Sequence, residues 1–194
     1  LADRFMRYVR IDTEADPNAS SFPSSEKQKD LGRLLTHELI ELGASDVEMD
    51  EWGYVFATIP SNSPNQNLPT ICFCSHMDTA PDCSGKDVKP ILHRAWNGSP
   101  ITLPDDTTQV ITVENQPYLN GKIGQDVITA SGLTLLGADD KAGVTIIMEL
   151  AKHLLTHSEI PHGKIRILFT PDEEVGRGVE HLDMNKLGAD YGYT

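Results

Sequence analysis

The chain has few cysteines, an excess of acidic over basic residues, and no long apolar run. Its 3 cysteines are too few, and odd in number, for a disulfide framework. With 16 Lys and Arg against 29 Asp and Glu, its net charge of −13 argues against nucleic-acid binding, which needs a basic surface to displace phosphate counterions. The chain contains no stretch of about 18 uninterrupted apolar residues, so no transmembrane helix is predicted. The first ten residues carry several charges, so we expect no signal peptide among them.

The cysteines Cys72, Cys74 and Cys83 are predicted to be buried free thiols. Cys72 and Cys74 are two apart in an expected strand and would point to the same face. They could contribute to a thiolate metal site, but no second cysteine pair completes four ligands. Buried free thiols suit a reducing compartment, so we expect a cytoplasmic protein.

What the chain does have is the composition of a globular domain. Its 194 residues, 39% hydrophobic and 23% charged, are enough for one domain with a sizeable core. Helical spacing of apolar residues predicts helices over residues 1–10 and 23–43 and one that follows residue 140. Ser25 and Gln28 have the spacing of a capping box for the second helix. Short apolar runs predict strands over residues 47–51, 54–59, 68–74, 126–129, 133–136 and 165–169.

The order of these elements predicts the fold class. A strand, a helix and another strand in succession imply a right-handed crossover between parallel strands. We therefore expect an α/β fold with a mixed, largely parallel sheet flanked by helices. Residues 84–114 contain prolines and show weak periodicity, so we expect an irregular excursion with at most one short strand.

Three polar clusters follow apolar runs, where ligands collect beyond the carboxyl ends of strands. They occupy residues 75–78, 137–141 and 171–174. His76 and Asp78 would point to one side of an extended backbone, so the carboxylate could fix the tautomer of a metal-binding imidazole. Taken alone, such a short motif is more often a solvated loop.

The paired acids in the other two clusters are each open to two interpretations. Asp139 or Asp140 could be the N-cap of the third helix, and the other aspartate could bridge two cations that activate water. Glu173 and Glu174 could be solvated charge in a loop. Adjacent residues on extended backbone point opposite ways, however, so one glutamate could bind metal while its neighbour serves as general base.

Taken together, the clusters favour a metal site, because their carboxylates would repel one another without a cation between them. The chain has no Gly-x-Ser-x-Gly elbow and no phosphate-binding glycine loop. His153 and His157 are four apart on the third helix and could chelate a metal. They lack a carboxylate partner, so we expect them on an exposed helix face.

Three motifs together resemble the M20 family of zinc peptidases, in particular its tripeptide-cleaving aminopeptidases. They are Ser-His-Met-Asp-Thr-Ala-Pro-Asp at residues 75–82, Leu-Leu-Gly-Ala-Asp-Asp-Lys-Ala-Gly at 135–143 and Phe-Thr-Pro-Asp-Glu-Glu-Val-Gly at 169–176. Ile-Pro-His-Gly at 160–163 adds to the likeness. The resemblance covers essentially the whole chain, with little detail over residues 94–125. It implies a zinc exopeptidase-like catalytic domain.

The resemblance implies a role for each site residue. His76 and Glu174 would each bind zinc, and Asp139 would bridge two zinc ions. Asp78 would orient His76, and Glu173 would be the general base. The implied reaction removes the N-terminal residue from tripeptides through a metal-activated water, with two Zn²⁺ per complete site.

The resemblance also implies that the chain is incomplete. Family members are much longer, with an inserted lid and dimerisation domain and a further part of the catalytic domain. Their next metal-ligand aspartate lies just beyond a stretch that matches residues 191–194, and Asp140 is not a ligand in the family pattern. We therefore expect the N-terminal part of the catalytic domain, inactive or nearly so alone, from a protein that forms a homodimer through the inserted domain.

Two alternative functions stay open. Another M20 amidohydrolase, such as a dipeptidase, a carboxypeptidase or an N-acyl amino acid hydrolase, would share the chemistry and differ in its substrate groups. A non-catalytic metal-binding or structural remnant is the other alternative, because fold does not guarantee function.

Overall fold

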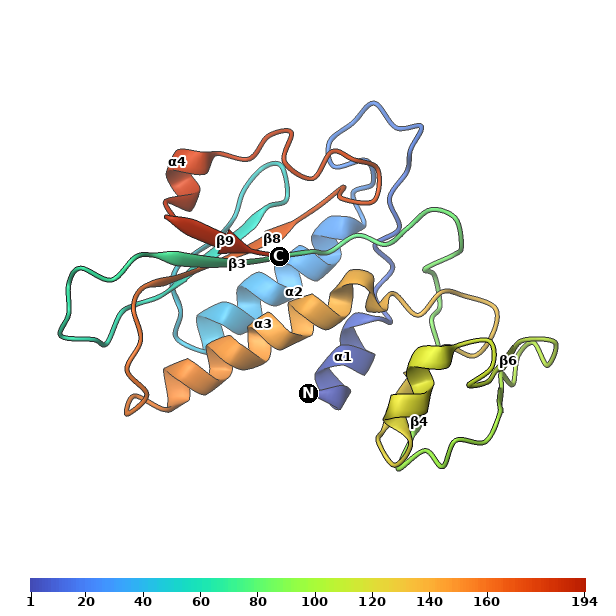
Figure 1. Cartoon of the computed structure of the whole chain (residues 1–194). Helices are drawn as coiled ribbons and strands as arrows, with labels where there is room; N and C mark the ends of the chain where they lie inside the picture. Colours follow the sequence, from blue (N-terminus) through green and yellow to red (C-terminus); the bar gives the residue numbers. More distant parts are fainter.

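A computed structural model describes residues 1–194, and a five-stranded mixed sheet lies at its centre (Figure 1). In spatial order the strands are β1 (Ser45–Met49), β2 (Val55–Ile59), β8 (Ile165–Thr170), β3 (Ile71–His76) and β9 (Tyr191–Tyr193). Strand β2 is antiparallel to both of its neighbours, whereas β3 is parallel to both β8 and β9. The predicted mixed α/β sheet is confirmed, with parallel pairing confined to β8, β3 and β9.

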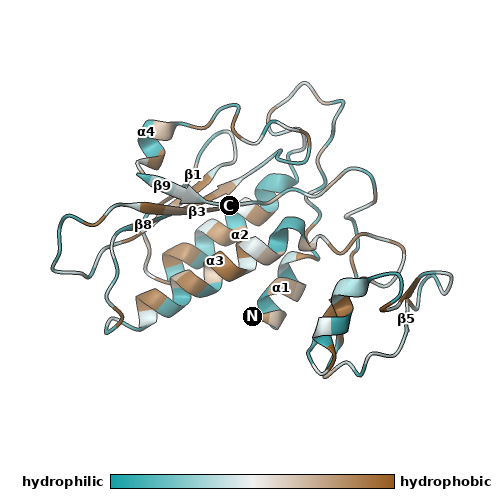
Figure 2. Ribbon diagram, viewed as in Figure 1, coloured by the Kyte–Doolittle hydropathy of each residue, from teal (hydrophilic) through white to brown (hydrophobic).

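Helices α2 (Gln28–Glu41) and α3 (Ala138–Thr156) lie side by side against one face of this sheet, with the shorter α1 (Ala2–Tyr8) beside α3 (Figure 1). Their apolar stripes and the facing strand residues form a cluster of 16 buried residues. Figure 2 shows hydrophobic colour on the strands and along both helices. Each fully buried large side chain contributes about 1.5–3 kcal/mol, so this cluster is the main source of the fold's stability.

The opposite face of the sheet carries a smaller core. Phe56, Cys72 and Leu168 point to this side, where they pack with Tyr54 and with Leu187 of the four-residue helix α4 (Met184–Leu187). Strands β2 and β8 are buried along their whole length, because alternate residues enter the two cores. None of the helices combines the length and the hydrophobicity that crossing a membrane requires.

Residues 84–132 leave this body and return to it (Figure 1). They contain two small sheets and a 3₁₀ helix: β4 (Ile91–His93) with β7 (Val127–Thr129), β5 (Ile101–Thr102) with β6 (Val110–Ile111), and η1 (Pro117–Lys122). Trp96, Ile101 and Leu103 form their buried cluster. The expectation of at most one strand over residues 84–114 is wrong, because three strands of two or three residues lie there. Strands that short leave no measurable periodicity in a sequence.

Three other sequence predictions need correction. Residues 133–136 form no strand; Leu135 makes one backbone bond, to Ser84, and β7 already has its partner in β4. The capping box at Ser25 is not formed, because α2 begins at Gln28 and has no side-chain cap. Cys72 is buried and Cys74 half-buried as free thiols, but Cys83 is exposed.

Candidate metal centre

Two of the three polar clusters meet at one edge of the sheet because β3 and β8 are parallel and in register. His76 ends β3 and is paired with Thr170, which ends β8. The third cluster does not follow a strand as predicted; it opens α3, which packs along β3. The result is a group in which ligand atoms of His76, Asp139 and Glu174 all lie within 4.8 Å of one another.

The start of α3 separates its two aspartates. Asp139 and Asp140 both have non-helical dihedral angles, and the peptide bond between them is cis. Asp140 Oδ1 accepts from Gly143 N at 3.1 Å, while its carbonyl accepts from the Ser75 hydroxyl at 3.1 Å. A Cβ at position 143 would lie 2.5 Å from Asp140 Oδ1, so this close approach requires glycine. Asp140 therefore caps the regular part of α3, which follows these two non-helical residues, and Asp139 is left to face His76.

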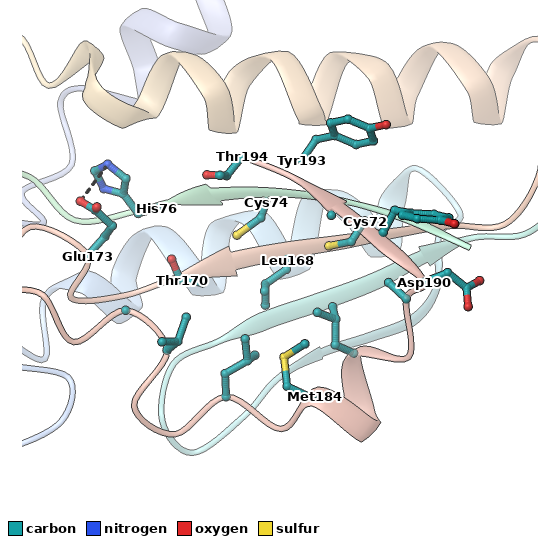
Figure 3. Close-up of a pocket in the computed structure, with 17 residues that line it drawn as sticks. Cys72, Cys74, His76, Leu168, Thr170, Glu173, Met184, Asp190, Tyr193 and Thr194 are labelled. Carbon is teal, nitrogen blue, oxygen red and sulfur yellow. Dashed lines mark ion pairs between the residues drawn. The ribbon is translucent and has the colours of Figure 1, made fainter. Parts of the chain in front are cut away.

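His76 is buried among carboxylates. Its Nε2 lies 3.6 Å from Glu173 Oε2 (Figure 3). The same nitrogen lies 2.9 Å from Asp139 Oδ1. On the other side of the ring, Nδ1 lies 3.1 Å from the Asp78 carbonyl oxygen and 3.4 Å from Asp78 Oδ1. Burial opposes a charge on the ring, but the surrounding carboxylates, with Asp78 foremost, outweigh it and raise the pKa of His76 to about 9.

Asp78 holds the backbone of the glutamate loop as well as facing the imidazole. Its side chain is fully buried, and its two oxygens accept from Glu173 N at 3.1 Å and from Glu174 N at 3.0 Å. Sequence reasoning placed Asp78 beside His76 but missed this clamp. No motif reveals a bond between a side chain and backbone groups that lie 95 and 96 positions further along the chain.

Glu173 and Glu174 differ in environment, although they are neighbours. The Glu173 side chain is 59% exposed and reaches toward His76. Glu174 is half-buried, and its pKa is raised by that burial and by the negative charges of Asp139, Asp78 and Glu173. The two side chains thus have the separate surroundings that a metal ligand and a general base require.

The residues present fit a divalent metal ion. One imidazole nitrogen and two carboxylate oxygens form a donor set that zinc prefers. The neighbouring carboxylates raise the pKa of His76, and burial together with the same negative charges raises the pKa of Glu174. A cation would compensate the same charge. The assignment of individual ligands and of a second metal stays a prediction.

A cavity of about 530 Å³ extends from the candidate metal centre along the sheet, with His76 and Glu173 at one end (Figure 3). Cys72 and Cys74 line it. Burial raises the pKa of these thiols to about 11 and about 12, so they stay protonated at neutral pH and are poor metal ligands. His153 and His157 are both exposed, as predicted, but α3 ends at Thr156, so His153 lies on the helix and His157 follows it.

Comparisons with known proteins point in the same direction as this geometry. A model of the peptidase family M20/M25/M40 matches residues 134–192. Peptidase T of Bacillus mycoides (strain KBAB4) and Peptidase T of Bacillus cereus (strain B4264) are each 47% identical over all 194 residues. The chain spans 47% of the length of these curated relatives.

Two solved structures share the fold and part of the sequence. The aminopeptidase PepT from Bacillus cereus ATCC 10987 superposes with a TM-score of 0.67 at 27% identity. A tripeptidase from Staphylococcus aureus gives 0.66, also at 27% identity. Each match covers 99% of this chain and 41% of the other.

Proposed function

Since the chain belongs to the M20 peptidase family, we propose that the protein carrying it is a metal-dependent aminopeptidase that removes the N-terminal residue from tripeptides. The observation that carries this proposal is the convergence of His76, Asp139 and Glu174 at one sheet edge, with the Glu173 carboxylate beside them. The names of the relatives, an aminopeptidase and a tripeptidase among them, support the substrate class.

His76, Asp139 and Glu174 are the residues that would hold the metal. We propose zinc, with Asp139 as the bridge between two ions. Zinc bound there would supply a positive charge that lowers the pKa of water and polarises a peptide carbonyl. Asp78 keeps the His76 ring in place through its carbonyl oxygen and its carboxylate, so that Nε2 faces the centre.

Glu173 is the proposed general base. Its exposed carboxylate lies beside the metal centre and can accept a proton from water, then return it to the amine of the departing residue. The hydrogen bond from the Glu173 backbone N–H to Asp78 fixes the backbone position from which this side chain extends. A base held in this way needs little reorganisation when the proton moves.

The charge around the site suits a substrate with a free amino terminus. The Glu173 side chain is 59% exposed, and the chain as a whole has a net charge of −13. A protonated N-terminal amine is attracted to such a surface, whereas an acylated one gains nothing from it. This difference favours an aminopeptidase over an N-acyl amino acid hydrolase.

In this proposal residues 1–194 form the N-terminal part of a catalytic domain. The relatives extend well beyond the matched region, and the equivalent sequence in the whole protein would supply the remaining ligands, a lid and the homodimer interface. The free thiols of Cys72 and Cys74 support a cytoplasmic location.

The test compares a free tripeptide with its N-acetylated form in the whole protein. We expect the free peptide to lose its N-terminal residue and the acetylated one to stay intact, with activity lost after chelation and restored by zinc. Equal cleavage of both peptides would favour another M20 amidohydrolase. Activity that survives complete removal of metal would contradict the proposal.

A further inference from the structure

Asp172 is the acid of the 171–174 loop that the proposed reaction does not use. It is fully buried, and its carboxylate accepts three hydrogen bonds: from Ser24 N at 2.6 Å, from Ser24 Oγ at 2.5 Å and from Gln28 Nε2 at 2.7 Å. Its own N–H donates to Gln28 Oε1 at 3.1 Å. Four bonds thus tie one loop residue to a segment that precedes it by up to 148 positions.

The backbone at Asp172 has the left-handed conformation, with φ of 57°. Aspartate and asparagine are the residues other than glycine that adopt it most readily. At this turn, the Asp172 side chain bonds to Ser24 and Gln28, while the next two backbone N–H groups bond to Asp78. The loop that carries Glu173 and Glu174 is therefore tethered from two directions.

The hydrogen bonds of Asp172 with Ser24 and Gln28 connect the loop to the main core. Gln28 is the first residue of α2 and is fully buried, and Ser24 is only 5% exposed. The helix that follows is anchored by Leu31 and Leu35, both fully buried in the large cluster. In Figure 1 the blue segment before α2 and the orange-red segment after β8 lie together. Any shift of the loop would leave buried polar groups unpaired, which is costly in a dry interior.

We propose that Asp172, with Ser24 and Gln28, is a positioning residue that fixes the backbone of Glu173 and Glu174. It touches neither metal nor substrate and acts through the two residues that follow it. The proposal rests on the proposed function for the roles of these glutamates. Displacements of about 1 Å in a catalytic group can cost on the order of 100-fold in rate, so a doubly tethered loop has a direct catalytic consequence.

Two variants break this network without removing the loop. Asp172→Asn keeps the size and the tolerance of the left-handed conformation, but it replaces one acceptor oxygen with an amide donor. Gln28→Leu removes both bonds to Asp172 at similar volume. The matched control is Asp183→Asn, since the Asp183 carboxylate also accepts hydrogen bonds, from Asn185 N and Lys186 N, but does so at the exposed start of α4.

The first measurement is hydrogen exchange of the Glu173 and Glu174 amides, which needs neither metal nor activity. In both network variants we expect these amides to exchange about 10- to 100-fold faster, as loss of a hydrogen bond to a charged group implies. The amides of β8 and those of the control should keep their wild-type rates. Unchanged exchange at Glu173 and Glu174, or equal acceleration throughout β8, would overturn the proposal.

The second measurement is steady-state kinetics of the whole protein. A positioning role lowers kcat by about 10- to 100-fold with KM nearly constant, and Asp183→Asn leaves both unchanged. A lowered melting temperature with normal kcat would show a merely structural role and contradict positioning. If the wild-type protein cleaves no peptide, the proposed function fails, and the exchange result alone decides the role of Asp172.

Discussion

The body of the molecule and the excursion over residues 84–132 are built on different scales. The body has 16 residues in its main core and strands of up to 6 residues, whereas the excursion has a 3-residue cluster and strands of 2 or 3. Every predicted site residue belongs to the body, at the edge where β3 and β8 end. The site thus depends on the long-range packing of the larger core.

This difference also separates two kinds of acidic residue. Asp78 and Asp172 are fully buried, and their oxygens accept bonds from loops distant in sequence. Asp105 and Asp106 in the excursion are bonded to nearby groups at the surface. Changes at the first pair should disturb the site, and changes at the second pair should not.

The largest difference between the regions is expected for Glu173→Gln in the whole protein. Loss of a general base lowers kcat by about 10²- to 10⁴-fold, while the metal content stays at the wild-type level because His76, Asp139 and Glu174 are intact. The matched control in the excursion is Glu114→Gln, an exposed glutamate, which should retain normal turnover. Tripeptide cleavage together with metal analysis measures both, and normal turnover in Glu173→Gln would remove its assigned role.

The second-largest difference between the regions is expected for truncations of side chains in their two cores. Leu35→Ala leaves a cavity in the main core and should lower the free energy of unfolding by about 2–5 kcal/mol. Trp96→Ala removes a larger side chain but should mainly accelerate hydrogen exchange in residues 91–129, because its cluster is small and separate. Urea unfolding of Leu35→Ala and hydrogen exchange of both variants check this. If Trp96→Ala destabilises β8 as much as Leu35→Ala does, the two regions form one cooperative unit.

Loss of the Asp78 clamp should have a moderate effect on both stability and metal binding. In Asp78→Ala the Glu173 and Glu174 amides lose their acceptor, at a cost of about 1.5–3 kcal/mol each at most. We expect zinc affinity to fall about 10- to 100-fold. The control is Asp105→Ala in the excursion. Calorimetry should give a wild-type zinc affinity for Asp105→Ala and a weaker one for Asp78→Ala.

The smallest effect concerns pH. Glu38 in the body is buried, which opposes its charge, but hydrogen bonds from Arg7 and Tyr8 and the charges of Arg4 and Arg7 lower its pKa below the ordinary value. A lowered folded pKa stabilises the protein at pH above about 4.3, and this contribution is lost as the pH falls through the folded pKa.

Glu38→Gln should therefore be less stable than the wild-type protein at neutral pH. This difference in the free energy of unfolding should become smaller as the pH falls below about 4.3. Chemical unfolding at several pH values measures this difference. A difference that stays constant down to pH 2 would show that the ion pairs of Glu38 with Arg4 and Arg7 do not contribute to stability.

Much of the body could be predicted from the sequence, because its elements are long enough to show their period. The buried stripe of α3 and the continuous apolar run of β8 indicated a helix and an interior strand. For the aspartate pair, helix capping explained one residue and left the other for a site. The structure assigns the cap to Asp140.

What the sequence could not predict depends on contacts between distant segments. Gln28 has the spacing of a capping residue, but its side chain is bonded to Asp172 instead. Strand β9 is only three residues long, and its partner β3 lies far from it in the sequence. The short strands of the excursion carry too few residues for any periodicity.

Zinc titration of the metal-free whole protein tests the central claim most directly. The account predicts that wild-type protein binds zinc and that His76→Ala, Asp139→Ala and Glu174→Ala each weaken binding by more than about 100-fold, beyond the loss expected from residues outside the ligand set. Glu114→Ala in the excursion should bind like wild type. Wild-type affinity in all three ligand variants, or no zinc bound by the wild-type protein, would contradict the account.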